Sequence, residues 1–313
     1  MTKYSLPYPL PLKNPHSPYR NFNYIRPIYI KGINQDLRDY QVKIVLTKDN
    51  FPLEKCKSDG SDIRFRDNTG KKLPYWIESW SSDKAVIWCK VPFIPANRIK
   101  DIWIIYGNPS ASDASDGDAT FEFFDDFEGT SLDADKWNSY QTYPGGSIAV
   151  ENSYVELDAY LITSKNYQIT DGIIETKVKI ISKEGSMFVR STGNTGNQWT
   201  SSYGLHSGDL GAGNDWNLAI TQDDERKFAD TTQAILNEWL LLRFTLNGNS
   251  LKGGRFKYAD MSSNGGPVEG TLTKYSSGYV GLRVDGTGSG DRIAHYDWIL
   301  VRKYADLEPT VII

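Results

Sequence analysis

A sugar-binding surface needs flat aromatic rings for the apolar side of a pyranose and planar polar groups for its hydroxyls. Side chains of both kinds are concentrated between positions 190 and 217 of this chain. They are Arg190, Trp199, Tyr203, His206, Asp215, Trp216 and Asn217. If the strands that carry these residues pair as neighbours, the side chains gather along one face of a sheet and its rim. The sequence therefore predicts a carbohydrate-binding surface in this segment.

Each of these residues also has a simpler interpretation. Trp216 could fill a core, Tyr203 could be one member of a cross-strand pair, and Arg190 could bridge to a nearby carboxylate. The prediction therefore depends on the set as a whole and not on any single member.

Other site chemistries lack the residues that they need. His16, His206 and His295 have no zinc-type spacing to one another or to Cys56 and Cys89. The sequence has no Gly-rich phosphate loop before a helix and no Gly-x-Ser-x-Gly nucleophile motif. Cys89 lies in an apolar run, so a buried free thiol is favoured over a disulfide between the two cysteines.

The charge pattern excludes several classes of partner. The 35 Lys and Arg against 39 Asp and Glu give a net charge of −4, with no basic run that could follow a phosphate backbone. We therefore expect no nucleic-acid partner. No apolar run approaches the ~20 residues of a bilayer span, so we expect no membrane insertion. The start, broken by Pro7, Pro9 and Pro11, is a poor signal peptide, so the chain is either an excised piece or leaves its cell by another route.

The composition predicts an all-β protein with almost no helix. Nine Trp, 19 Tyr and 12 Phe beside 27 Gly suit short strands joined by Gly-rich turns, and 313 residues favour two domains. We expect a Pro-rich extended arm over residues 1–22, a β-sandwich over 23–108, a hinge over 109–120 and a second sandwich over 121–313. Trp239 to Asn247 is interpreted as a strand that enters an Asn-Gly hairpin.

A series of short segments runs through the first half of the chain: Asp39-Tyr-Gln-Val, Ser61-Asp-Ile-Arg-Phe, Leu73-Pro-Tyr-Trp-Ile-Glu, Ala85-Val-Ile-Trp, Lys90-Val-Pro and Tyr106-Gly-Asn-Pro. Together they resemble domain-of-unknown-function family 2341, which occurs in archaeal and bacterial surface proteins. In that family the block commonly runs into a Phe-Phe-Asp-Asp-Phe segment, and Phe123 to Phe127 has this sequence.

The second half resembles the concanavalin A-like lectin/glucanase superfamily, which includes laminin G-like modules. FEFFDDFEGTSLDADKW at 121–137 is similar to the opening strand, and Gly278-Tyr-Val-Gly-Leu-Arg and His295-Tyr-Asp-Trp are similar to closing strands. The resemblance implies two β-sandwiches in tandem, the second a concanavalin A-like jelly roll. Members of this superfamily bind sugars, and some cut them.

Sugar-cutting members such as the glycoside hydrolase family 16 enzymes carry their carboxylates on one strand as Glu-x-Asp-x-Glu. Alternate residues then share one face, at the ~5 Å separation that a retaining mechanism needs. The sequence contains no such triplet. Residues 223–225, Asp-Asp-Glu, are contiguous and are interpreted as a solvated turn. We therefore expect that the protein is not an enzyme.

Jelly rolls of this superfamily often hold a structural Ca²⁺ that ties the first strand to the last. Ca²⁺ takes six to eight oxygen ligands. The resemblance implies Asp125, Asp126, Glu128 and Asp297 as its ligands. The alternative is that Asp126 caps a turn and Asp297 accepts a hydrogen bond.

The sequence thus predicts a non-catalytic, extracellular or surface-exposed carbohydrate-binding or adhesion protein that binds a polysaccharide or glycan on a cell surface. The first alternative is a structural or receptor-binding protein of a virion or extracellular filament, which would self-associate through its arm or its edge strands. The second is a glycoside hydrolase with an unfamiliar site that uses Asp209, Asp215 or Glu225.

Overall fold

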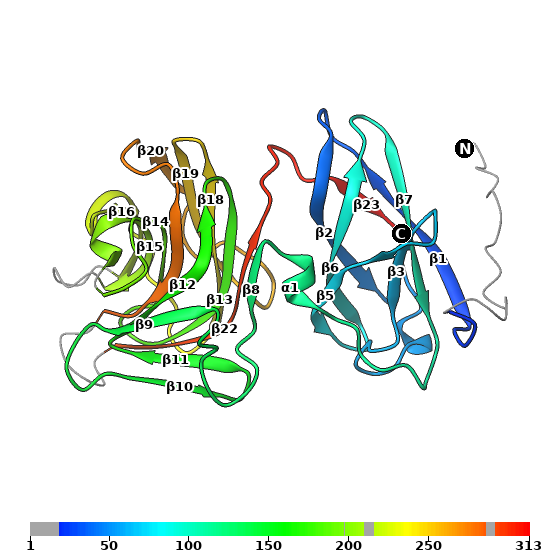
Figure 1. Cartoon of the computed structure of the whole chain (residues 1–313), viewed down its shortest axis with the longest axis horizontal. Helices are drawn as coiled ribbons and strands as arrows, with labels where there is room; N and C mark the ends of the chain where they lie inside the picture. The colour runs from blue at the N-terminus through cyan, green and yellow to red at the C-terminus, as the bar shows by residue number, and fades with distance from the viewer. Residues whose placement is uncertain (1–18, 197, 210–215, 286–291) are drawn as a thin grey trace. The chain divides into compact units, whose positions relative to one another are not determined.

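The computed structural model describes residues 19–196, 198–209, 216–285 and 292–313, so most of the Pro-rich arm lies outside the described part. The chain divides into two compact units (Figure 1). The first unit ends at Phe121 and also contains Ala305–Ile313, and the second unit is Glu122–Tyr304. The chain therefore leaves the first unit, completes the second, and returns.

The first unit is a sandwich of two antiparallel sheets. Its strands are β1 (Tyr24–Lys31), β2 (Leu37–Thr47), β3 (Arg64–Asp67), β4 (Lys72–Leu73), β5 (Tyr75–Trp80), β6 (Lys84–Ile94), β7 (Ile99–Tyr106) and β23 (Thr310–Ile312). One sheet has the order β23-β1-β7-β3-β4 and the other β2-β6-β5. Alternate apolar residues such as Ile28, Ile44 and Ile87 fill the core.

Two segments that we expected to be free connections are folded onto the first unit. At the end of the arm, Tyr19 and Phe22 are buried with Ile105. In the expected hinge, the backbone N–H of Asp116 donates to the Tyr75 carbonyl over 2.8 Å. The Asp116 carboxylate also caps the four-residue helix α1 (Gly117–Thr120). Residues 109–120 are therefore held in place along much of their length.

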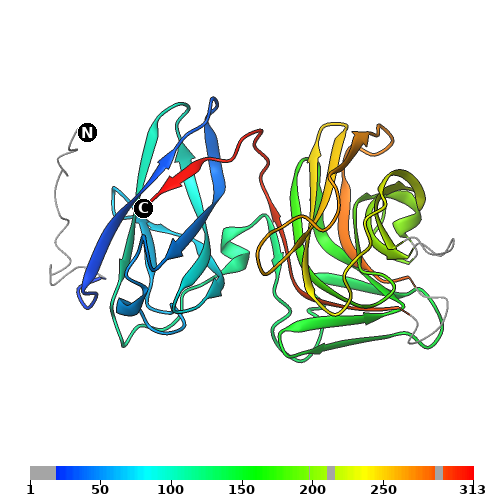
Figure 2. The same ribbon diagram turned by 180° about the vertical axis from the view of Figure 1, so that it is seen from behind.

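The last residues of the chain belong to the first unit and not to the second, where we had placed them. β23 pairs with β1, with Val311 opposite Ile30, and Figure 2 shows the red strand beside the blue one. The Tyr40 hydroxyl donates to Glu308 over 2.6 Å. The second unit therefore ends at Tyr304 instead of residue 313.

The second unit is a larger antiparallel sandwich. Its strands are β8 (Phe123–Asp125), β9 (Trp137–Gln141), β10 (Ser147–Glu151), β11 (Tyr154–Asp158), β12 (Tyr160–Ile169), β13 (Gly172–Ser182), β14 (Ser186–Ser191), β15 (Tyr203–Asp209), β16 (Trp216–Gln222), β17 (Glu225–Asp230), β18 (Trp239–Asn247), β19 (Ser250–Lys257), β20 (Val268–Thr271), β21 (Gly278–Arg283) and β22 (Ile293–Arg302). One sheet, which we call the β22 sheet, has the order β10-β11-β22-β13-β18-β19-β20, with β8 beside β22. The other, which we call the β15 sheet, has the order β17-β16-β15-β14-β21-β12-β9.

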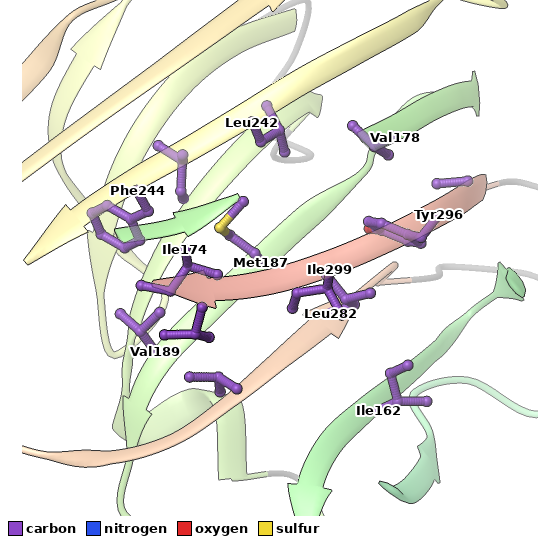
Figure 3. Packing of buried hydrophobic residues seen from close by; sticks show 14 of the residues in the cluster. Ile162, Ile174, Val178, Met187, Val189, Leu242, Phe244, Leu282, Tyr296 and Ile299 are labelled. Atoms are coloured by element: carbon purple, nitrogen blue, oxygen red, sulfur yellow. The ribbon is translucent and has the colours of Figure 1, made fainter. Parts of the chain in front are cut away.

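The core of the second unit lies between these two sheets (Figure 3). Ile174 and Val178 of β13 face inward with Phe244 of β18, and Met187 and Val189 of β14 meet them from the other sheet. Each side chain that is buried in this way contributes about 1.5–3 kcal/mol. The all-β prediction, with a β-sandwich in each unit, is confirmed, and so is the strand at Trp239–Asn247 with its hairpin.

Cys56 and Cys89 are free thiols, as predicted. Burial, and then the nearby carboxylates of Asp62 and Glu54, raise the pKa of the Cys56 thiol to about 12. Within the described ranges, no helix is long and apolar enough to cross a membrane.

The pairing of β23 with β1 can be tested through the stability of this edge of the sheet. Val311 packs against the core, so we expect Val311→Asp to lower the stability of this sheet edge by about 1–3 kcal/mol. Hydrogen exchange of the β1 amides measures the effect and should become faster. Ile312→Asp is the matched control, because the Ile312 side chain is 48% exposed. Equal exchange in the two variants would contradict the pairing.

Candidate functional site

A pocket opens in the β15 sheet, and we name it the His206 pocket. Its lining is Ser186, Met187, Phe188, Ser202, Gly204, His206, Thr221, Asp224 and Arg283. Its cavity volume is about 10 Å³, room for about one water-sized group and far below the ~300–1,000 Å³ of pockets for drug-sized ligands. It therefore admits a single hydroxyl-sized group and not a whole ring.

Strand alternation places the polar lining on the face opposite the core. Met187 and Val189 of β14 point into the sandwich, so Ser186 and Phe188 point the other way. On β15, Leu205 points inward and His206 outward. The pocket is thus formed by the outward side chains of adjacent strands.

Two glycines flank Phe188 and leave room for the hollow. Phe188 lies opposite Gly204 on β15 and Gly281 on β21. A Cβ atom at Gly281 would lie 2.2 Å from Cζ of Phe188, and one at Gly204 would lie 2.5 Å from Oγ1 of Thr221. Any larger residue at these positions would therefore crowd the pocket or the Phe188 ring.

A fully buried carboxylate lies beneath the pocket. Glu184, 1% exposed, accepts a hydrogen bond from the Ser186 hydroxyl over 2.8 Å and one from Nη1 of Arg292 over 3.0 Å. Nδ1 of His206 lies 3.3 Å from Oε1 of Glu184. A buried charge is tolerated only when it is paired and hydrogen-bonded in this way.

These partners decide the charge of Glu184. Burial alone would raise its pKa, but the hydrogen bond with His206 and the positive charges of Arg283, His206 and Arg292 outweigh it and lower the pKa to about 2. A carboxyl group that acts as a general acid in sugar hydrolysis needs a raised pKa. The environment of Glu184 therefore keeps it ionised and suits a structural anion.

The other ring nitrogen of His206 faces the open side of the pocket. Nε2 lies 3.4 Å from Nη1 of Arg283 and 3.7 Å from Oδ1 of Asp224. Arg283 donates to Asp224 over 3.0 Å and to Asp285 over 2.5 Å. The Asp224 side chain is 37% exposed and that of Arg283 only 4%. Asp224 is therefore the charged group of the pocket that solvent reaches most readily.

Ser186, His206 and Glu184 do not form a nucleophilic relay. Such a relay needs the serine on one ring nitrogen of the histidine and the acid on the other. Here the Ser186 hydroxyl and the Glu184 carboxylate both lie 3.3 Å from Nδ1. The group can hold hydrogen-bonding atoms in place, but it does not activate Ser186.

The structure separates the predicted sugar-binding residues. His206 lines the pocket, whereas Tyr203 is 0% exposed in the core, where its hydroxyl accepts from the Tyr275 amide over 2.8 Å. Arg190 is also buried and donates to the carbonyls of Thr170 and Gly248. The prediction of Tyr203 and Arg190 as ligand contacts was therefore wrong, because both belong to the packing of the sandwich.

The remaining members of the set are only partly described. Trp199 lies in the short 3-10 helix Gln198–Ser201, and Trp216 and Asn217 begin β16. Their side chains and the whole of Asp215 lie outside the described part. Their role in binding stays a prediction.

Sequence reasoning missed Asp224 and Arg283. The turn at Asp223 and Asp224 was predicted correctly, and both residues have positive φ. Its interpretation as merely solvated was wrong, because Asp224 reaches Arg283 of β21. The sequence signal was the spacing of Gly281 and Arg283, which lie two positions apart and so share one face of a strand.

The predicted calcium ligands do not form one group. Asp125 is buried and accepts hydrogen bonds from the Phe127 amide and from Nε1 of Trp137. Asp297 lies at a β-bulge of β22 and pairs with Lys177 at 2.5 Å. Among the residues that the structure describes, no three His, Cys, Asp or Glu side chains lie close enough to hold a metal ion. The predicted set of Asp125, Asp126, Glu128 and Asp297 is therefore not assembled.

Residues 59–140 match a family model described as Domain of unknown function (DUF2341). The match begins in the first unit and ends within β9 of the second, so it starts later than expected and continues past Phe121. The chain is also 28% identical over 158 residues to Uncharacterized protein MJ1472 of Methanocaldococcus jannaschii. That alignment covers 45% of this chain and 27% of the relative, so the chain spans about a quarter of the relative's length.

Several solved β-sandwiches are similar in structure. The carbohydrate binding module CBM66 from Bacillus subtilis has a TM-score of 0.39 at 16% identity and covers 51% of this chain and 91% of its own. A protein of unknown function with galectin-like fold from Bacillus subtilis has 0.44 at 11%, covering 58% and 96%. LamAcat from Zobellia galactanivorans has 0.42 at 16%, covering 60% and 100%. With TM-scores below 0.5, these neighbours do not bear on the activity of this chain.

The lowered pKa of Glu184 predicts how stability changes with pH. The folded value, about 2, lies below the ordinary 4.5, so the stabilisation is complete above pH 4.5 and is lost as the pH falls toward 2. It amounts to about 3 kcal/mol. Urea unfolding between pH 7 and 3 should show the wild type and Glu184→Gln converging as the pH falls.

A control variant separates this effect from general acid denaturation. Glu269→Gln removes an exposed carboxylate that pairs with Lys252, and its unfolding curve should run parallel to that of the wild type. If Glu184→Gln also ran parallel, Glu184 would not be the titrating group.

The separation of the predicted calcium ligands predicts how the melting temperature responds to a chelator. We expect excess EDTA to leave the melting temperature unchanged, because Asp125 and Asp297 are engaged by Trp137 and Lys177. Differential scanning calorimetry in calcium and in EDTA provides the measurement. A fall of several degrees in EDTA would point to a metal held by oxygens other than this set.

Proposed function

We propose that the second unit is a non-catalytic carbohydrate-binding module of an extracellular, surface-exposed adhesion protein, and that the His206 pocket receives a hydroxyl group of the sugar. The glycan of a cell surface is its partner. The observation that carries this proposal is the Asp224 carboxylate, fixed by Arg283 beside His206 at the exposed side of a small polar pocket. Carboxylates and imidazoles that are held in this way match the hydroxyls of a sugar ring.

The polar groups around the pocket support binding over hydrolysis. Glu184 is buried and already paired with the groups around it, and the Ser186 hydroxyl donates a hydrogen bond to it. Glu225, which the hydrolase hypothesis invoked, pairs with Lys227 at 2.8 Å on β17. The described residues of the pocket thus supply Asp224 as the one accessible carboxylate, whereas hydrolysis with retention or inversion uses two.

A glycan array tests the proposal. The wild type should bind at least one glycan saturably, and Gly204→Ala should weaken that binding at least ~10-fold because its Cβ enters the pocket beside Thr221 and His206. Gly254→Ala, a glycine on β19 of the other sheet, is the matched control and should bind as the wild type does. Thermal melting confirms that each variant is folded.

Other outcomes distinguish the rival functions. Silence of the folded wild type across the array, together with trimers or larger species in light scattering, would favour the virion or filament protein. Release of reducing ends from a bound glycan would favour the hydrolase. Binding that survives in Gly204→Ala would place the sugar elsewhere on the chain.

A further inference from the structure

The buried guanidinium group of Arg283 in the His206 pocket is already paired with carboxylates. Nη1 of Arg283 donates to Asp224 and Nη2 donates to Asp285, at 3.0 and 2.5 Å. Because Arg283 is 4% exposed and Asp224 37%, a ligand that enters meets the carboxylate and not the guanidinium. An anionic ligand therefore finds no free positive charge there.

The charged groups around the pocket also include more acids than bases. Arg292 pairs with Glu184, and Arg283 pairs with Asp224 and Asp285. The carboxylates of this network outnumber its guanidinium groups. The group that faces solvent is an acid, so a ligand that approaches the pocket meets a negative charge first.

Asp224 is held in place from both sides. Asp223 and Asp224 form the tight turn between β16 and β17, with φ of 54° and 66°. The Asp223 carboxylate binds Lys274 and the Tyr275 hydroxyl, which anchors the turn. Arg283 holds Oδ1 of Asp224. The carboxylate is thus positioned before any ligand arrives.

We infer that the His206 pocket selects neutral, hydroxyl-bearing sugars over acidic ones, and that Asp224 makes this selection; the inference rests on the proposed function. A neutral hydroxyl donates a charge-assisted hydrogen bond to Asp224. A uronate carboxylate at the same place meets a like charge, and this repulsion is stronger in a partly buried pocket than in bulk water. The expected preference for the neutral sugar is at least ~10-fold.

The test uses pairs of glycans that differ only in charge. Oligosaccharides that end in glucose, galactose or mannose are compared with the same glycans that end in the corresponding uronate. The proteins are the wild type, Asp224→Asn and Glu225→Gln. Asparagine keeps an oxygen for Arg283, and Glu225 is the neighbouring acid, with a side chain 77% exposed and paired with Lys227. Melting curves establish that all three are folded.

We expect the wild type to prefer the neutral member of a pair at least ~10-fold, with a smaller ratio at 1 M salt, where the Debye length is about 3 Å. Asp224→Asn should reduce the ratio below ~3-fold, and Glu225→Gln should leave it unchanged. Equal or tighter binding of the uronate by the wild type would overturn the inference and leave the proposed function standing. So would an unchanged ratio in Asp224→Asn. Binding of neither member would overturn both.

Discussion

The second unit depends on the pairing of one carboxylate that no solvent reaches. Removing a single partner from a buried ion pair typically costs about 3–5 kcal/mol, because the remaining charge is left without compensation. Glu184 therefore requires Ser186, His206 and Arg292 to stay where they are. Those residues come from β14, from β15 and from the segment before β22, so the charge links these three parts of the chain in addition to strand pairing.

The same network links the two sheets. Tyr296 of β22 lies in the core, and its hydroxyl meets the amide of Ser186 over 2.8 Å and the carbonyl of Arg283 over 3.0 Å. The positions of Ser186 and Arg283 in the pocket are thereby tied to the opposite sheet. A pocket supported in this way loses little freedom when a ligand group enters, which favours recognition of a hydroxyl in one fixed orientation.

Local patterns predicted the strands well, because a period of two is set by the backbone itself. The same period could have separated Tyr203 from His206, since residues three apart on a regular strand face opposite sides. Asp224 and Arg283 were out of reach, because 59 positions separate them and only sheet pairing brings them together. The calcium ligands were predicted wrongly as one group for a similar reason. The sequence does not reveal the β-bulge in β22 where Asp297 pairs with Lys177.

The return of the chain to the first unit has a consequence for biosynthesis. β8 pairs with β22, with Phe123 opposite Val301, so the entry and exit of the second unit are neighbouring strands. A ribosome makes β1 before the second unit and β23 after it, and domains generally fold as they emerge. The edge of β1 that pairs with β23 therefore stays without this partner while the second unit is translated. During that interval the nascent chain exposes an open strand edge, which could pair with another chain.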